Sequence, residues 1–297
     1  MPKNAGPPPR GGLVVVDKPA GMTSHDVVAR VRRLAGTRRV GHAGTLDPMA
    51  TGVLVVGVGR ATRLLGHLAL HDKDYLATAR LGESTDTDDA DGVVLESRPA
   101  SHLDPELIAS AAGGFVGDVE QRPPGVSAIK VAGKRAYARV RAGEDVVLAS
   151  RRVRVERFQV LGVRPHDDAL DVDFEVRCSS GTYVRALARD LGAQLGVGGH
   201  LTALRRTRVG GFDLTRARTL ASLEEEFALI SLDDAAAAAF TRRDLDAADA
   251  ARLAHGGRLS PSGVAGEPVA AFSPDGTFVA LLEDRDGSAY PVAVFVG

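Results

Sequence analysis

The chain has 297 residues, 44% of them hydrophobic and 4% aromatic, which is enough for one large domain and a small one with an aliphatic core. Its single cysteine, Cys178, excludes an internal disulfide and a multi-cysteine zinc site, and it agrees with a reducing cytoplasm. The net charge is −1, but residues 122–160 hold ten Lys/Arg against three acids and residues 177–218 hold eight Arg against two acids. Such a run is often only a solvated face, yet it favours phosphate contacts, for which we expect Arg205 and Arg206 to be used.

The N-terminal part begins with a Pro-rich polar stretch, residues 1–10, which predicts disorder and lacks the apolar centre of a signal peptide. Residues 13–16 are an apolar run typical of a strand. Thr23 or Ser24 is placed to cap a helix that ends at Gly36, because the apolar residues between them follow a helical period. No apolar run in the sequence approaches the roughly 20 residues that cross a bilayer.

A loop over residues 41–52 carries three glycines and Pro48, a density that indicates a shaped backbone. The apolar run 53–58 follows at once and predicts a buried strand that anchors the loop. The loop presents His42 and Asp47 and contains no Lys or Arg. Taken alone, an Asp-Pro pair is typical of an ordinary turn.

The middle of the chain predicts strands and one helix. Residues 74–81 alternate as a strand, and residues 83–91 are an acidic loop that cannot bind phosphate by charge. A helix over 104–114 ends at two glycines. Residues 152–158 and 170–176 alternate with period two, which predicts antiparallel strands with one wet face.

A second helix is predicted over residues 183–195, where Tyr183, Leu187 and Leu191 form one stripe. Arg185 lies in its first turn, where a cation is electrostatically misplaced against the helix dipole. Such a break with a local rule indicates function, and this arginine is placed to pair with a carboxylate from another loop. Cys178, just before the helix, is interpreted as a small buried hydrophobe.

The C-terminal part predicts an acidic helix over residues 219–240 and a domain boundary near residue 240. Apolar runs separated by Gly, Pro and Asp turns then predict a small β-rich module over 241–297. No metal-binding motif, Walker loop or dinucleotide fingerprint stands in a convincing context, so we expect no metal and no cofactor.

Beyond these local patterns, the stretch GHAGTLDPMATGVL at 41–54 closely resembles the active-site motif of the TruB family of tRNA pseudouridine synthases. Four further blocks follow the family's order: VVVDKPAGMTSHD at 14–26, KDYLATARLGESTDTDDADG at 73–92, QRPPGVSAIKVAGKRAY at 121–137 and CSSGTYVRALARDLG at 178–192. Five blocks in order are far more specific than one. The resemblance implies an α/β fold with a mixed, largely antiparallel sheet and flanking helices, with a catalytic domain over 11–240 and a PUA-like domain over 241–297.

The resemblance also implies the catalytic roles. Asp47 is the essential catalytic residue, Arg185 pairs with its carboxylate, and Tyr75 stacks on the target base. On the residues alone, Tyr75 would be an ordinary strand tyrosine on a half-buried face. Three chemical roles remain open for the Asp47 carboxylate: attack on the ribose C1′, attack on the uracil C6, or removal of the C2′ proton.

Four further residues are assigned to substrate binding. Tyr183 lines the pocket, and Leu204 lies near the pocket wall by family resemblance. Lys18 is a surface lysine on chemical grounds alone, but the resemblance places it against the active site in a supporting role. His42, on the same loop as Asp47, either fills the gap left by a flipped base or bonds to the backbone.

The function implied is isomerisation of uridine 55 in the T-loop of tRNA by a monomeric, cytoplasmic enzyme. One alternative is a pseudouridine synthase with a different RNA target. Another is a non-catalytic RNA-binding or tRNA-chaperone protein, although intact Asp47, Tyr75 and Arg185 argue against it. A hydrolase using Asp47 lacks an evident water-activating partner.

Overall fold

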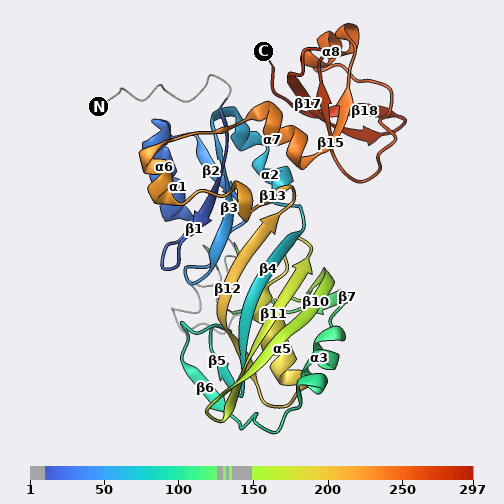
Figure 1. Ribbon diagram of the computed structural model, residues 1–297. Helices are drawn as coiled ribbons and strands as arrows, with labels where there is room; N and C mark the ends of the chain where they lie inside the picture. Colours follow the sequence, from blue (N-terminus) through green and yellow to red (C-terminus); the bar gives the residue numbers. More distant parts are fainter. Residues whose placement is uncertain (1–10, 126–129, 132–133, 136–148, 297) are drawn as a thin grey trace. The chain divides into compact units, whose positions relative to one another are not determined.

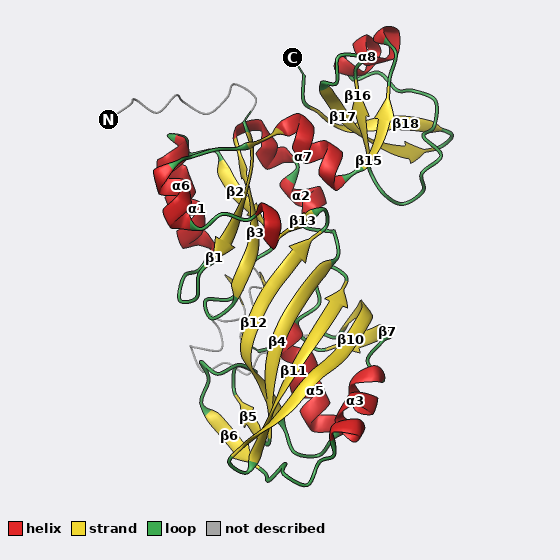
Figure 2. Cartoon of the chain, in the orientation of Figure 1, coloured by secondary structure: helices red, strands yellow, loops and turns green. Residues whose placement is uncertain are grey.

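The computed structural model describes residues 11–125, 130–131, 134–135 and 149–296 (Figure 1). The disorder expected for residues 1–10 lies outside this range. The chain forms two compact units, both built of helices and strands (Figure 2). Unit 1 holds Met1–Pro48, Gly52–Ala69 and Arg208–Gly297, and unit 2 holds Met49–Thr51 and Leu70–Thr207.

The sheet of unit 1 is centred on β1 (Gly12–Lys18) and β3 (Thr51–Val58), which pair antiparallel with Gly12 opposite Val58. β2 (Val40–Ala43) pairs antiparallel with β3, and β14 (Ile230–Ser231) with β1. The apolar residues of β1 and β3 are almost all fully buried. Continuous apolar runs of this kind are typical of strands that are covered on both faces.

Helix α1 (Ser24–Ala35) confirms the predicted helix and its cap. The Thr23 hydroxyl accepts a hydrogen bond from the Asp26 N–H, and the Asp26 carboxylate accepts one from the Thr23 N–H. This reciprocal capping box fixes where the helix begins. Gly36 ends it with φ 61°, a left-handed conformation that glycine adopts without a steric penalty.

The single helix predicted over 219–240 is instead two helices, α6 (Leu220–Glu225) and α7 (Leu232–Ala239). Thr219 and Ser231 each act as an N-cap, because their hydroxyls accept hydrogen bonds from backbone N–H groups three residues later. The second cap starts a new helix, which sequence periodicity alone did not separate from the first. Shorter elements of unit 1 are η1 (Gly59–Arg63), α2 (Leu65–Leu68), β13 (Phe212–Asp213) and η2 (Leu214–Arg216).

The β-rich C-terminal module predicted from the sequence is confirmed. Its strands follow the order β15 (Thr241–Asp244), β16 (Val269–Phe272), β17 (Phe278–Arg285) and β18 (Ser288–Val294), with helix α8 (Ala247–Ala254). β15 and β16 are parallel and the other pairs are antiparallel. Phe272, Phe278 and Phe295 stack in its interior and share one apolar cluster with Ala235 and Ala236 of α7.

Unit 2 is built on the antiparallel series β4 (Lys73–Leu81), β11 (Ala169–Cys178), β10 (Arg151–His166) and β7 (Gly117–Gln121). β12 (Gly199–Val209) has most of its residues in this unit. The predicted alternation is confirmed, since one side carries cross-strand ion pairs such as Arg80–Asp171 at 2.9 Å and Arg157–Glu175 at 3.0 Å. The expected largely antiparallel α/β fold is therefore present.

Helices α3 (Pro105–Gly113) and α5 (Val184–Gln194) lie over one face of these strands (Figure 2). Two small hairpins complete unit 2: β5 (Glu83–Thr85) with β6 (Val94–Ser97), and β8 (Lys130–Val131) with β9 (Lys134–Arg135). In the part of the chain that the structure describes, none of the helices combines the length and the apolar character needed to cross a membrane.

Candidate active site

Asp47 lies in the loop between β2 and β3, and both of its neighbours in the chain are anchored. The Ser24 hydroxyl donates to the Leu46 carbonyl (3.1 Å) and accepts from the Leu46 N–H (2.9 Å). On the other side, the Pro48 carbonyl accepts from Lys18 Nζ (3.2 Å) and from the Gly21 N–H (2.8 Å). Asp47, a partly exposed residue, is therefore carried by a backbone that is fixed before and after it.

Lys18 is fully buried, so the interpretation as a surface lysine is wrong. Its ammonium donates to the carbonyls of Pro19 (2.9 Å), Met22 (2.6 Å) and Pro48 (3.2 Å). A buried ammonium is costly unless its donors are satisfied, and these three carbonyls match its three N–H groups. Lys18 thus supports the loop backbone next to Asp47, and a direct contact with substrate stays a prediction.

His42 lies in β2 opposite Val56, not on the loop where it was expected. The reason is that β2 pairs with β3 as far as Ala43, so the loop begins at Gly44, two residues after His42. The His42 ring stands edge-on to the ring of His25 in α1, with centroids 5.6 Å apart at 81°. The sequence analysis did not identify His25, and the base-filling role of His42 stays a prediction.

Arg185 is the second residue of α5 and is only 4% exposed. Its Nη1 donates to Asp89 Oδ2 (3.0 Å) and to the Thr87 carbonyl (2.7 Å). The Asp89 carboxylate offsets the cation at the positive end of the helix, which explains why this local rule is broken. Sequence reasoning missed Asp89 because the acidic run around it was interpreted only as a loop that cannot bind phosphate.

The acidic segment around Asp89 also contacts the next turn of α5. Arg189, one turn after Arg185, donates to Asp88 Oδ2 (2.8 Å) and to the Arg122 carbonyl (2.8 Å). Burial raises the pKa of the Asp88 carboxyl, although Arg189 opposes this effect. Asp88 and Asp89 therefore each form an ion pair with one arginine of α5.

Tyr75 and Tyr183 are fixed by different means. Tyr75 lies on β4 opposite Val176 and is 6% exposed. Tyr183 precedes α5, and its N–H donates to Gln121 Oε1 (2.8 Å) while its carbonyl accepts from Gln121 Nε2 (3.0 Å). The guanidinium of Arg151 lies 4.4 Å from the centroid of the Tyr183 ring.

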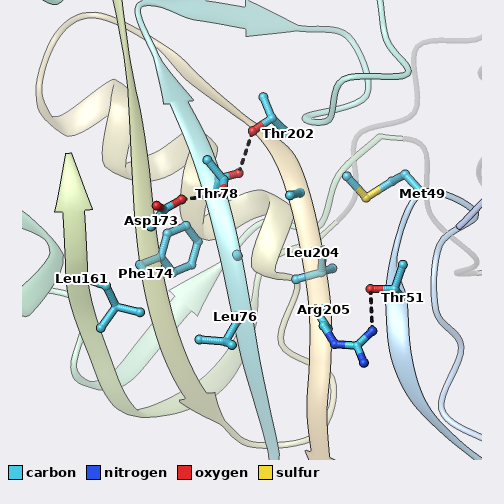
Figure 3. Close-up of a pocket in the computed structure, with 12 residues that line it drawn as sticks. Met49, Thr51, Leu76, Thr78, Leu161, Asp173, Phe174, Thr202, Leu204 and Arg205 are labelled. Atoms are coloured by element: carbon cyan, nitrogen blue, oxygen red, sulfur yellow. Dashed lines mark hydrogen bonds between the residues drawn. The ribbon is translucent and has the colours of Figure 1, made fainter. Parts of the chain in front are cut away.

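Leu204 lies on β12 and lines a cavity of about 570 Å³ in unit 2, together with Met49, Thr51 and Leu76 (Figure 3). This volume is within the range of small-ligand sites. Beside it, Arg205 Nη1 donates to the Thr51 hydroxyl (3.3 Å). Leu204 therefore lines a cavity, and its place near the substrate stays a prediction.

Arg206 is only 1% exposed, so the expectation that it contacts phosphate at the surface is wrong. Its side chain belongs to the interior of unit 2. There the burial of Lys73 and, to a smaller extent, the positive charge of Arg206 lower the pKa of Lys73 to about 8. The Lys73 ammonium donates to the His71 carbonyl (2.6 Å).

Within the described residues, no three His, Cys, Asp or Glu side chains gather in a way that would hold a metal ion.

Cys178 is confirmed as a buried thiol, at 1% exposure. Burial raises the pKa of this thiol from 9.0 to about 12.

Since the thiolate is the reactive form, we expect the Cys178 thiol of the native protein to react about a thousandfold more slowly than a free thiol at pH 8. A disulfide reagent should label one thiol per chain only after denaturation, whereas Ser101→Cys should add one that reacts in the native protein. Rapid labelling of the unaltered native chain would contradict the burial.

Ser24→Ala tests whether the anchored loop matters for turnover. The change removes the two hydrogen bonds to Leu46, which is 3% exposed, and leaves a buried N–H without its partner. We expect about a tenfold or larger fall in saturated turnover, because small misplacements of a reacting group are costly. The matched control is Ser222→Ala on α6, whose hydroxyl donates to the Thr219 carbonyl within its own helix turn. Equal turnover in the two variants would show that the anchor is dispensable.

The predicted residues fall in both units. Lys18, His42 and Asp47 belong to unit 1, and Tyr75, Tyr183, Arg185 and Leu204 belong to unit 2. The pairing of Asp47 with Arg185 therefore stays a prediction.

Comparison with known proteins gives matches along nearly the whole chain. Residues 32–184 match the N-terminal domain of TruB family pseudouridylate synthases, 185–248 the C-terminal domain of tRNA pseudouridylate synthase B, and 240–296 the C-terminal part of tRNA pseudouridine synthase II. The tRNA pseudouridine synthase B of Thermobifida fusca (strain YX) is 62% identical over 290 residues, covering 96% of this chain and 99% of that protein. That of Nocardia farcinica (strain IFM 10152) is 58% identical, covering 96% and 94%.

Among solved structures, the crystal structure of a Cbf5–Nop10–Gar1 complex is similar, with a TM-score of 0.76 and 25% identity over 100% of this chain and 91% of that chain. The structure of an H/ACA RNP bound to a substrate RNA containing 2′-deoxyuridine has a TM-score of 0.74 at 24% identity, covering 97% and 86%. The latter likeness concerns the fold.

Proposed function

Because the chain belongs to the TruB family of pseudouridine synthases, we propose that it isomerises a uridine of tRNA to pseudouridine, and that the target is uridine 55 in the T-loop. The observation that carries this proposal is the signature loop, in which Asp47 stands between two residues anchored by Ser24 and Lys18. The tRNA partner is proposed on the names of the relatives, each called a tRNA pseudouridine synthase B.

The reaction needs a carboxylate that is held in place. The N-glycosidic bond must break, the free uracil must turn, and a carbon–carbon bond to the same ribose must form. Asp47 acts by attack on C1′ or C6, or by taking the C2′ proton, and each route uses the same carboxylate. The fixed backbone on both sides of Asp47 favours each of the three routes, since holding a reacting group in the right orientation lowers the activation barrier.

Arg185 is the proposed partner of Asp47. Its Nη1 is already directed by Asp89 and Thr87, so the plane of the guanidinium is set before substrate arrives. A planar guanidinium matches a carboxylate through two parallel hydrogen bonds. Asp89 is thereby a positioning residue for the proposed pair.

Substrate binding requires that the uridine leave its stack, because an RNA loop hides its glycosidic bond. Tyr75 stacks on the uracil, and Tyr183 and Leu204 line the pocket. His42 fills the space that the flipped base leaves. Residues 11–240 carry these groups in the proposed division, and residues 241–297 form the PUA-like domain.

Tritium release from a tRNA transcript made with 5-tritiated uridine tests the function. Moving the glycosidic bond from N1 to C5 displaces the hydrogen on C5, so each turnover releases one tritium. We expect release to approach one per tRNA without added metal or cofactor. Tight tRNA binding with no release would favour the non-catalytic alternative, and release from other RNAs but not from tRNA would favour a different target.

A further inference from the structure

Two strand ends bracket residues 122–150, and both contact Tyr183. Gln121 is the last residue of β7 and Arg151 is the first residue of β10. The two are direct partners in the antiparallel pairing of these strands. Tyr183, which they both reach, lies 32 residues after Arg151 and immediately before α5. One cross-strand pair thus holds one tyrosine.

Gln121 holds the main chain of Tyr183. Its side chain is fully buried, and its amide both accepts from the Tyr183 N–H (2.8 Å) and donates to the Tyr183 carbonyl (3.0 Å). Tyr183 is the N-cap residue of α5, but its side chain makes no capping hydrogen bond. Its backbone geometry therefore depends on the hydrogen bonds from Gln121. The two bonds to one peptide segment fix both its position and its orientation.

Arg151 holds the ring of Tyr183. Its guanidinium lies over the ring, 4.4 Å from the centroid, and its Nη2 donates to the carbonyl of Gly181, two residues earlier. A cation over an aromatic face is attracted by the ring quadrupole, most strongly where water is excluded. The Nε atom is buried and, among the described residues, has no hydrogen-bond partner. This arginine therefore has one face on the tyrosine and is not simply a solvated cation.

We propose that Gln121 and Arg151 are positioning residues that set the orientation of the Tyr183 ring, one through its main chain and the other through its face. The inference rests on the proposed function, in which Tyr183 lines the uracil pocket. It distinguishes Arg151 from the other arginines of the basic stretch 122–160. A phosphate contact would govern affinity for RNA, whereas a residue that orients the pocket governs the rate once RNA is bound.

Arg151→Gln and Arg151→Lys test the proposal through single-turnover rates at saturating tRNA and through tRNA dissociation constants. We expect Arg151→Gln to lower the saturated rate about tenfold or more and to change the dissociation constant less than about twofold. Arg151→Lys should restore part of the rate, since an ammonium also lies favourably over a ring. Arg164→Gln is the matched control, because Arg164 is on the same strand and pairs with Asp173.

A double-mutant cycle adds a stricter condition. In a Tyr183→Leu background, Arg151→Gln should cause no further loss of rate, because both changes remove the same interaction. An additive loss would overturn the proposal. So would a weaker dissociation constant with an unchanged saturated rate, which would make Arg151 a phosphate contact.

A readout that needs no turnover separates this inference from the function itself. The chain has four tyrosines, so a protein labelled with carbon-13 in its tyrosine rings gives few signals, and Tyr183→Phe assigns the one of interest. We expect this signal to shift in Arg151→Gln and to stay in place in Arg164→Gln. If the unaltered protein released no tritium, the proposed function would fail, but the tyrosine signal would still decide whether Arg151 orients the ring. An unmoved signal would overturn the inference.

Discussion

Asp47→Asn is expected to abolish pseudouridine formation, by at least about 10⁴-fold, while tRNA binding survives. Asp47 is the one acid in the signature loop, and asparagine has nearly the same size but is neither a nucleophile nor a base. The side chains of Ser24 and Lys18 hold Leu46 and Pro48 by their backbone atoms, so the loop should keep its shape in the variant. Single-turnover tritium release and tRNA binding, measured on the same preparation, give the two quantities.

Asp167→Asn serves as the matched control for this exchange. Asp167 lies at the turn between β10 and β11 with φ 50°, a left-handed conformation that asparagine also tolerates. The control variant should turn over like the unaltered protein. Normal turnover by Asp47→Asn would remove Asp47 from the reaction and with it the proposed mechanism.

Arg185→Lys is expected to lower the saturated rate by about 100-fold or more. The guanidinium donates to Asp89 and Thr87 through Nη1 and is proposed to reach Asp47 with its other donors. A lysine ammonium cannot reproduce that fork. Because the side chains of Arg185 and Asp89 are 4% and 7% exposed, the change also disturbs a buried pair, and thermal melting must accompany the rate.

Arg80→Lys separates the general effect of such an exchange from the catalytic one. Arg80 also makes two hydrogen bonds to a carboxylate, that of Asp171 at 2.9 and 3.2 Å, in the same unit. We expect Arg80→Lys to lower the melting temperature modestly and to leave turnover unchanged.

Asp89→Asn should lower turnover with Arg185 still present, because the guanidinium loses its orienting charge. A near-normal rate in Arg185→Lys would mean that the pair with Asp47 does not form.

Sequence alone was sufficient where local patterns decide the structure. A cap at Thr23 or Ser24, the helix that ends at Gly36 and antiparallel strands in the regions of β10 and β11 were predicted, because each depends on residues close in the chain. The division of 219–240 into two helices was missed, although the Ser231 cap was present in the sequence. The acidic, alanine-containing stretch was interpreted as one continuous helix in spite of this cap.

The candidate site was harder to predict where its contacts are distant in the chain. Lys18 looked like a surface residue because one of the carbonyls that satisfies it, that of Pro48, lies 30 residues away. The ion pair of Asp89 was not predicted because its partner Arg185 lies 96 residues away. In both cases the residue type favours water, and only a satisfied buried partner reverses that preference. Family resemblance implied roles for Asp47, Arg185 and Tyr183. It did not predict the contacts of Ser24 with Leu46, of Asp89 with Arg185, or of Gln121 with Tyr183.

The measurement that tests the central claim most directly is the mapping of pseudouridine, at single-nucleotide resolution, in an unmodified tRNA transcript incubated with the protein. The proposed function predicts one pseudouridine, at position 55 in the T-loop, and none after incubation with Asp47→Asn. A transcript with cytidine at that position should stay unmodified throughout. Pseudouridine at other positions with uridine 55 unchanged, or an equal yield from Asp47→Asn, would contradict the account.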